Sequence, residues 1–191
     1  MWTRGSVPKR PKGADCKSAG LCLRRFESFP AHQTIHALLY ALLVMILTSL
    51  DLDGVVGRVT MVDGSFDPLH EGHIEYFRQA AQLGDPVLCN IAPDSWTAAK
   101  HPVLLERTKR AIVIDAIRFV DFVYLGESST LDALRRIRPK RYVKGSDWKL
   151  RGGIPSNEQL LCDETGIDVV YLDSVLNSST RLIDDLRRLG G

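Results

Sequence analysis

Cysteine is scarce in this chain of 191 residues, and several patterns that identify common protein classes do not occur. The four cysteines include no C-x-x-C pair, which argues against a zinc ribbon and thioredoxin chemistry, and they are too few for a disulfide scaffold. Neither G-x-G-x-x-G nor G-x-x-x-x-G-K-[ST] is found, so a dinucleotide fingerprint and a P-loop are unsupported. Hydrophobic residues make up 45% and charged residues 25%, which excludes a wholly disordered chain, a collagen-like fibre and a multi-span membrane protein.

Excess positive charge is confined to the N-terminal 32 residues. They carry seven Lys or Arg and two acidic residues, whereas the remainder carries 18 basic and 21 acidic residues, so the net +2 is the sum of +5 and −3. A nucleic-acid partner is therefore not expected. Residues 1–32 have no helical or strand period, a pattern that is typical of disorder. We favour the hypothesis that they are mis-annotated, a transfer-RNA gene read as protein, because codons for residues 15–18 and 25–28 can match arms of such a gene. A real basic disordered segment is the alternative.

The most hydrophobic stretch covers residues 35–50. As a helix these residues would span about 24 Å, which is short of the roughly 30 Å hydrocarbon core of a bilayer. We therefore favour a dispensable or mis-annotated segment over a membrane anchor, and we place residues 1–54 outside the domain as an N-terminal extension. A cytoplasmic protein is expected; tethering through residues 35–50 is the alternative.

Strand and helix patterns alternate through residues 55–191, which we take as one domain. Several strand-like runs are continuously apolar, as in strands that are covered on both faces. Alternation of this kind predicts an α/β fold, a Rossmann-like doubly wound parallel five-stranded sheet with helices on both faces. The expected strands are residues 58–62, 86–91, 121–125, 141–144 and 168–172, and the expected helices are residues 73–83, 104–117, 130–137, 157–165 and 179–189.

The loop after the first strand is the first place to look for a ligand site, because ligands bind beyond the carboxyl ends of such strands. His70 and His73 lie three residues apart at a helix start, so their side chains share one face. The helix start adds free N–H groups and a partial positive charge, and Gly72 lets a phosphate chain approach the backbone. Two imidazoles at a helix end fit a polyphosphate better than zinc, since no third metal ligand is apparent.

Four ordered motifs resemble the cytidylyltransferase-like nucleotidyltransferases, the H-x-G-H superfamily. They are GSFDPLHEGH at 64–73, IRFVD at 117–121, VKGSDW at 143–148 and SST at 178–180. Within this superfamily the chain most resembles glycerol-3-phosphate cytidylyltransferase and the adenylyltransferase domain of ADP-heptose synthase. The resemblance implies transfer of a nucleotidyl group from ATP or CTP to a phosphorylated sugar or polyol, with release of pyrophosphate. It also implies Mg²⁺ carried by the nucleotide rather than by protein ligands, and a homodimer as a common oligomeric state.

The resemblance also implies roles for individual residues. The catalytic group around the reacting phosphates would be His70, His73, Lys100 and Arg110. The nucleotide pocket would be formed by Gly64, Ser65, Phe66, Asp67 and Gly72, with Lys144, Gly145, Asp147 and Trp148 against the ribose and base and Ser178, Ser179 and Thr180 at the β- and γ-phosphates.

Each role has a structural alternative. Lys100 would be a solvated surface charge, Asp67 a turn residue before Pro68, Trp148 a packing residue, and the three hydroxyl residues ordinary helix caps. Arg107, one turn before Arg110, faces similarly, but a solvated surface charge is favoured for it.

The last motif departs from the cytidylyltransferase pattern R-T-x-G-I-S-T-T. Asp173 begins the corresponding stretch, D-S-V-L-N-S-S-T, so the arginine and the glycine–isoleucine pair are missing. Together with Lys144 in place of the cytidylyltransferase methionine, this favours AMP transfer of the ADP-heptose type. A CTP-dependent glycerol-phosphate-type enzyme and a non-catalytic nucleotide-binding regulatory homologue are the alternatives. The acceptor is not predicted by any motif.

Overall fold

The computed structural model describes residues 46–47, 52–126, 128–173 and 188. Ser178, Ser179 and Thr180 lie outside the described residues, as does the helix expected at 179–189 except for Arg188. The basic segment over residues 1–32 also lies outside them.

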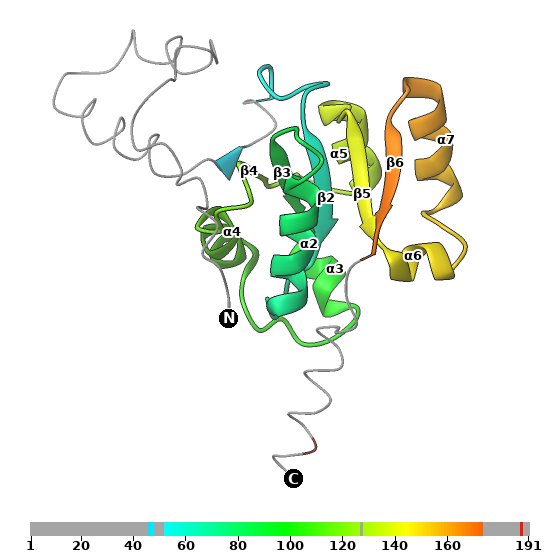
Figure 1. Cartoon of the computed structure of the whole chain (residues 1–191). Helices are drawn as coiled ribbons and strands as arrows, with labels where there is room; N and C mark the ends of the chain where they lie inside the picture. The colour runs from blue at the N-terminus through cyan, green and yellow to red at the C-terminus, as the bar shows by residue number, and fades with distance from the viewer. Residues whose placement is uncertain (1–45, 48–51, 127, 174–187, 189–191) are drawn as a thin grey trace, which may run out of the picture.

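A parallel six-stranded sheet forms the centre of the molecule, in the order β1-β4-β3-β2-β5-β6 (Figure 1). Five strands match the sequence prediction within two residues at each end, and all neighbouring strands are parallel. The α/β doubly wound fold is therefore confirmed. The strands are β1 (Ile46–Leu47), β2 (Thr60–Gly64), β3 (Val87–Ile91), β4 (Phe122–Tyr124), β5 (Arg141–Gly145) and β6 (Asp168–Leu172).

The sixth strand, β1, was not predicted, and it comes from the hydrophobic stretch over residues 35–50. Ile46 pairs with Val123 and Leu47 with Tyr124, which makes β1 an edge strand beside β4. Leu47 and Leu52 are buried in the same core cluster. The two-residue strand gives no periodic signal of its own within a continuously apolar run, so the sequence pattern suggested a separate segment. Residues placed outside the domain thus supply an edge of its sheet.

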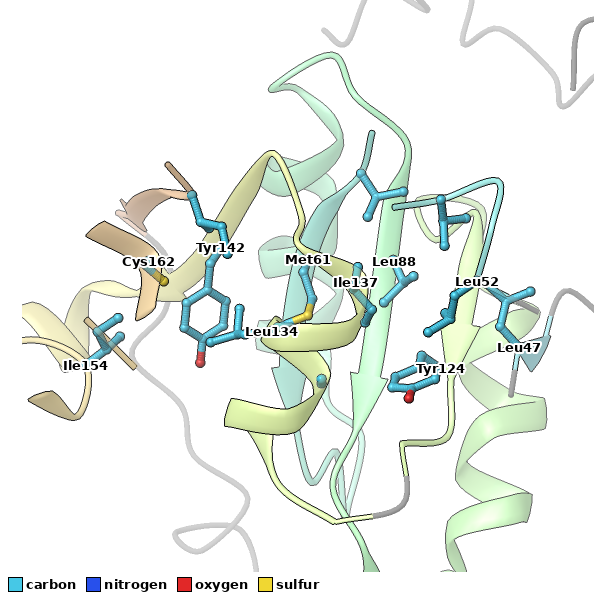
Figure 2. Packing of buried hydrophobic residues seen from close by; sticks show 14 residues of the cluster. Leu47, Leu52, Met61, Leu88, Tyr124, Leu134, Ile137, Tyr142, Ile154 and Cys162 are labelled. Atoms are coloured by element: carbon cyan, nitrogen blue, oxygen red, sulfur yellow. The ribbon is translucent and has the colours of Figure 1, made fainter. Parts of the chain in front are cut away.

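Helices cover both faces of the sheet. Phe77 and Ala80 of α2 pack with Ala111 and Ile114 of α4 on one face, while Leu134 of α5 belongs to the cluster on the other (Figure 2). Two short helices, α3 and α6, were expected as loops. The helices are α2 (Glu71–Ala81), α3 (Asp94–Ala98), α4 (Arg107–Asp115), α5 (Thr130–Ile137), α6 (Ser146–Leu150) and α7 (Ser156–Thr165).

The ends of these helices follow from local sequence. Ser129 caps α5 by accepting a hydrogen bond from the Asp132 amide at 3.2 Å, and Arg138 ends the helix in the left-handed region just before Pro139. Gly166 ends α7 at φ 71°, a conformation that glycine adopts without steric cost. Within the described ranges, no helix combines the length and hydropathy that a membrane-spanning segment needs.

The order of the strands defines where a ligand site is expected. β2 leads through α2 to β3 on one side, whereas β5 lies on its other side, so the order in which strands are added across the sheet reverses between β2 and β5. Open α/β sheets bind ligands at this switch point, beyond the carboxyl ends of the strands. Gly64 and Gly145 end the two strands there, and Figure 1 shows α3 and α6 at the same edge of the sheet.

Candidate active site

Two histidines at the start of α2 cap the helix reciprocally. His70 is the N-cap residue, and its Nδ1 accepts a hydrogen bond from the Gly72 amide at 3.1 Å. The His70 amide in turn donates to Nδ1 of His73 at 3.4 Å. The two rings stack with their centroids 3.8 Å apart. This is a capping box in which both side chains are imidazoles, and it fixes the rings at the positively polarised end of the helix.

These hydrogen bonds also fix which ring nitrogen carries the proton. Because Nδ1 of both neutral rings accepts from a main-chain amide, the proton of each ring resides on Nε2. His70 Nε2 is buried and has no hydrogen-bond partner among the residues that the structure describes. A buried N–H donor without a protein acceptor is costly unless another group satisfies it. His70 therefore presents a donor that suits a ligand oxygen.

Burial keeps the two rings uncharged near neutral pH. Desolvation lowers the pKa of His70, with a smaller opposing effect from Glu71. Desolvation and then repulsion from His70 lower the pKa of His73 to about 3. The uncharged rings can serve as N–H donors but add no positive charge, so the positive potential at this point comes from the helix end.

The loop before α2 supports the histidine rings. Phe66 is buried, and its ring meets the edge of the His73 ring with centroids 5.0 Å apart and planes inclined at 78°. Its backbone adopts φ 54°, so the side chain turns back over the end of β2. A Cβ on Gly64 would lie only 3.0 Å from this ring, so a larger residue there would require the Phe66 ring to shift. The Ser65 hydroxyl oxygen is buried and has no hydrogen-bond partner in the described part of the chain.

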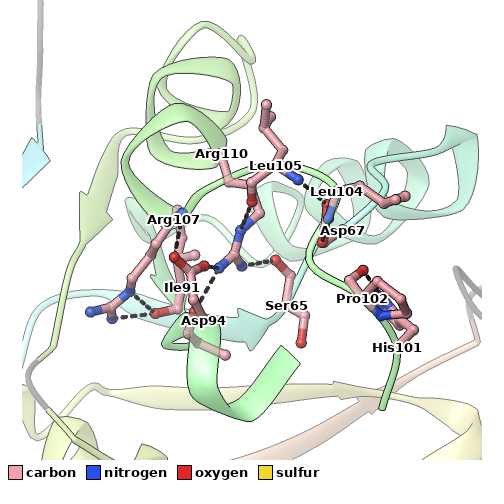
Figure 3. Close-up of polar contacts among 11 residues, drawn as sticks. Ser65, Asp67, Ile91, Asp94, His101, Pro102, Leu104, Leu105, Arg107 and Arg110 are labelled. Atoms are coloured by element: carbon pink, nitrogen blue, oxygen red, sulfur yellow. Dashed lines mark hydrogen bonds and ion pairs between the residues drawn. The ribbon is translucent and has the colours of Figure 1, made fainter. Parts of the chain in front are cut away.

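The structure places Asp67 and Arg110 in a buried clamp rather than at an open phosphate site (Figure 3). The Asp67 carboxylate accepts hydrogen bonds from the amides of Leu104 at 2.8 Å and Leu105 at 3.0 Å. The Arg110 guanidinium is 1% exposed and donates to the Leu105 carbonyl at 2.9 Å. It also donates to the carbonyls of Ser65 and Ala92 and to the carboxylate of Asp94. The guanidinium has five N–H donors, and these four protein acceptors use most of them.

Asp94, which had no signal in the sequence motifs, also belongs to this clamp, and so does Arg107, which is bonded to the protein rather than being a solvated surface charge. Asp94 accepts hydrogen bonds from Arg110 and from the Arg107 amide, and these outweigh partial burial and lower the pKa of its carboxyl. The Arg107 side chain donates to the carbonyl of Ile91 at 2.9 Å. Asp94 directly follows a proline after β3, between the strand expected at 86–91 and the helix expected at 104–117. The clamp therefore fixes the 64–67 loop, the end of β3 and the start of α4 against one another.

Lys144 lies at the end of β5 in a buried ion pair with a residue that was not singled out, Asp63 at the end of β2. Lys144 Nζ is 2.5 Å from Asp63 Oδ1. The ammonium lies over the rings of Trp148, 4.4 Å from its centroid, and Tyr142, at 5.0 Å. Parallel pairing of β2 with β5 brings Asp63 and Lys144 together, and that register is not readable from either segment alone.

The remaining predicted residues lie around these groups with differing exposure. Lys100 follows α3 and is exposed, with Nζ 5.3 Å from the centroid of the Trp96 ring. Desolvation and then the charge of Lys144 lower the pKa of Lys100, while Asp63 opposes them, so this ammonium lies within electrostatic range of the β2 and β5 ends. Gly72 is buried in the first turn of α2, Gly145 is the N-cap of α6, and Asp147 is exposed and paired with Arg151 at 3.4 Å.

No metal centre is formed by the described residues, which contain no group of three His, Cys, Asp or Glu side chains placed to hold a metal ion. The donors described at the start of α2 and at the ends of the neighbouring strands are N–H groups of imidazoles and ammonium groups, and the ammonium of Lys144 is paired with Asp63. Such a set fits anionic oxygen atoms better than a cation.

Comparison with known proteins agrees with the family resemblance of the sequence motifs. The cytidylyltransferase-like family matches residues 61–182. Bifunctional protein HldE from Methylococcus capsulatus is 34% identical over 136 residues, which are 68% of this chain and 28% of that protein. FAD synthase from Thermococcus kodakarensis is 36% identical over 91 residues, 46% of this chain and 61% of that protein. This chain thus spans less than a third of the HldE protein that it matches.

A solved structure agrees with these sequence matches. The lipopolysaccharide core biosynthesis protein from Thermoplasma volcanium superposes with a TM-score of 0.53 at 25% identity, covering 62% of this chain and 98% of that one. The family match covers β2 from its second residue, β3 to β6, the paired histidines and the β5 motif described above, whereas β1 lies outside it. The chain belongs to the cytidylyltransferase-like family.

Proposed function

We propose that this protein is a nucleotidyltransferase that joins a nucleotide, AMP in preference to CMP, to a phosphorylated sugar or polyol and releases pyrophosphate. The observation that carries the proposal is the buried Nε2 donor of His70, held at the start of α2 by reciprocal capping with His73. Family membership supports the reaction class. FAD synthases among the relatives support AMP, because FAD contains an adenylate unit.

In this reaction the protein has to align the two reactants and stabilise the developing negative charge. An oxygen of the acceptor phosphate attacks the α-phosphorus of the triphosphate, and the bond from that phosphorus to the bridging oxygen breaks. The electron pair leaves with pyrophosphate, so a covalent enzyme intermediate and a strong general base are not required. Groups that donate hydrogen bonds to the α- and β-phosphates then stabilise the charge that develops in the transition state.

The predicted site residues take the following roles in this scheme. The Nε2–H groups of His70 and His73 and the start of α2 bind the phosphates, and Lys100, which follows α3, is proposed to bind the reacting phosphates. Mg²⁺ held by the triphosphate would neutralise part of its charge. Arg110 and Asp67 act as positioning residues that fix the loop beneath the histidines, since their polar groups are bonded to the protein. Ser178, Ser179 and Thr180 are proposed at the distal phosphates. We place the reaction in the cytoplasm, where triphosphates are available.

Pyrophosphate release tests the proposal. Purified protein is incubated with Mg²⁺ and either ATP or CTP, across a panel of phosphorylated sugars and polyols, and pyrophosphate is measured with a coupled assay. Turnover with ATP and one class of acceptor is expected. Tight binding of a triphosphate without turnover on any acceptor would contradict the enzyme and favour a nucleotide-binding regulatory protein. Light scattering of the same sample reports whether it is a dimer.

A further inference from the structure

One tyrosine hydroxyl lies between two carboxylates that come from different elements. The Tyr142 hydroxyl of β5 donates to Glu158 Oε2 of α7 at 3.0 Å and lies 3.4 Å from Asp63 Oδ1 of β2. Tyr142 is buried and Glu158 is half-buried. Burial, and then the charge of Asp63, raise the pKa of Tyr142, so the hydroxyl keeps its proton. A single O–H can donate fully to only one of the two carboxylates.

Asp63 also holds the ammonium of Lys144. Their side chains are 8% and 7% exposed, and Asp63 Oδ1 lies 2.5 Å from Lys144 Nζ. Thr130, the first residue of α5, fixes the other carboxylate oxygen by donating to Oδ2 at 2.8 Å. Lys144 and Tyr142 thus share Oδ1 as an acceptor. A change in the hydrogen bond of Tyr142 therefore changes how firmly Asp63 holds Lys144.

The side chains of Asp63, Tyr142, Lys144 and Glu158 form a group that we call the Asp63 cluster. With every acid and base ionised, the cluster carries one excess negative charge, since two carboxylates share one ammonium. An unpaired charge away from water is costly, and a proton on one carboxylate removes it. Glu158 is the better site for that proton, because Asp63 is paired directly with Lys144. Burial, and then the charge of Asp63, raise the pKa of Glu158 against smaller opposing effects of Lys144 and Tyr142.

The groups that face Glu158 come from three directions. From β2 and β5 it faces the other members of the Asp63 cluster. On its own helix lies the thiol of Cys162, whose pKa is raised to about 11 by burial and then by the charge of Glu158. α5 packs against α7 and contributes apolar Leu134 to the core cluster that contains Cys162 (Figure 2). The proton on Glu158 is therefore governed by the Asp63 cluster.

We infer that Tyr142 and Glu158 are positioning residues for Lys144, acting through Asp63, and that a proton gained by Glu158 loosens the hold of Asp63 on Lys144. The proton comes from solvent. Glu158 then donates to the Tyr142 oxygen, and the Tyr142 hydrogen turns to Asp63 Oδ1. Lys144 shares that oxygen with a second donor, and the excess negative charge is gone. Both changes favour binding of an anion at Lys144. The inference rests on the proposed function, because that function places a triphosphate in this site.

Binding of ATP with Mg²⁺ to the full chain, measured by calorimetry as a function of pH, tests the inference. Glu158→Gln imitates the protonated acid, because its amide donates to Tyr142 and carries no charge. It should bind ATP about fivefold more tightly than the wild type at about pH 8, the scale of one partly screened unit charge. This advantage should shrink as the pH falls toward about 5, where the wild type gains its proton. Glu164→Gln removes an exposed carboxylate of the same helix and should match the wild type throughout.

Removal of the linking hydroxyl separates the hydrogen-bond route from a purely electrostatic effect. In a Tyr142→Phe background, Glu158→Gln should change the affinity for ATP by less than about twofold. A measurement on the wild type needs neither this variant nor a ligand. Carbon-13 NMR of the Glu158 carboxyl, assigned by its absence in Glu158→Gln, should show a titration midpoint above that of an ordinary glutamate.

Three results would overturn the inference: a Glu158→Gln advantage that does not vary with pH, one that persists in full without the Tyr142 hydroxyl, or a Glu158 carboxyl that titrates at its ordinary value. A wild type that binds no triphosphate at any pH would instead overturn the proposed function. The carboxyl titration would then still decide whether the proton resides on Glu158.

Discussion

The main-chain amide of His70 donates to Nδ1 of His73 at 3.4 Å, while the ring of His70 accepts from the amide of Gly72 at 3.1 Å. Helix capping therefore uses one nitrogen of each ring and leaves Nε2 as the donor for a ligand. Structural and functional roles reside on different atoms of the same side chains, so substitutions can separate them.

Substitution of His70 separates helix capping from phosphate binding. Asparagine is a good N-cap residue and alanine is not, so His70→Ala should lower the free energy of unfolding by about 1 kcal/mol relative to His70→Asn. Both variants lack the Nε2 donor, and both should lower turnover by about 10²–10³-fold, the scale for loss of one preorganised donor. Urea unfolding and pyrophosphate release measure the two effects. Wild-type turnover in His70→Asn would show that only the cap matters.

The lowered pKa of His73 predicts a stability that depends on pH. In the unfolded chain the ring titrates near 6.5, whereas in the folded protein its pKa is about 3, so between these values the unfolded state binds the additional proton. Stability is therefore fully present above about pH 6.5 and is lost as the pH falls toward 3, by up to about 1.4 kcal/mol per pH unit.

Comparison with a variant isolates this contribution. His73→Gln removes the titrating ring, so its free energy of unfolding should decline less steeply than that of the wild type between pH 6.5 and 4.5. The lowered pKa of His70 acts in the same direction in both proteins and cancels in the comparison. Parallel pH profiles for the two proteins would contradict a buried neutral His73.

Lys100 is expected to act on the chemical step. Its ammonium is exposed and lies within electrostatic range of Lys144 and Asp63, and the resemblance to the family assigns it to the reacting phosphates of the proposed complex. Lys100→Ala should lower kcat by about 10²-fold with a smaller change in KM. Lys149→Ala removes an exposed lysine of α6 and should behave as the wild type. A change in KM alone would assign Lys100 to ground-state binding.

Arg110 should behave as a structural residue. Arg110→Met removes donors from three main-chain carbonyls and from Asp94, all of which stay partly or fully buried, so the free energy of unfolding should fall by about 3 kcal/mol. Lys109→Met, on the same helix but exposed, should change it by less than about 0.5 kcal/mol. An Arg110 variant with wild-type stability and no turnover would instead identify Arg110 as a phosphate ligand.

Local sequence was sufficient to predict the sheet and most helices, because each strand and helix carries its own period and its own end signals. The predicted start of the first helix at His73 was two residues late, since a capping histidine has no standard signature. β1, α3 and α6 have two or five residues each and were too short for any period to appear.

Contacts between segments that are distant in the sequence could not be predicted from local patterns. The motif placed Arg110 on the right helix, but the direction of its guanidinium depends on carbonyls from Ser65 and Ala92, which only the fold brings near. Asp63 lies 81 residues from Lys144, so their pairing depends on the register of β2 against β5.

A crystal structure of the protein with Mg²⁺ and a non-hydrolysable ATP analogue tests the central claim most directly. The account predicts that Nε2 of His70 lies within hydrogen-bond distance of a phosphate oxygen at the start of α2, with Nδ1 still bonded to the Gly72 amide. A triphosphate bound elsewhere, with both imidazole rings covered by protein and in contact with no ligand oxygen, would contradict it.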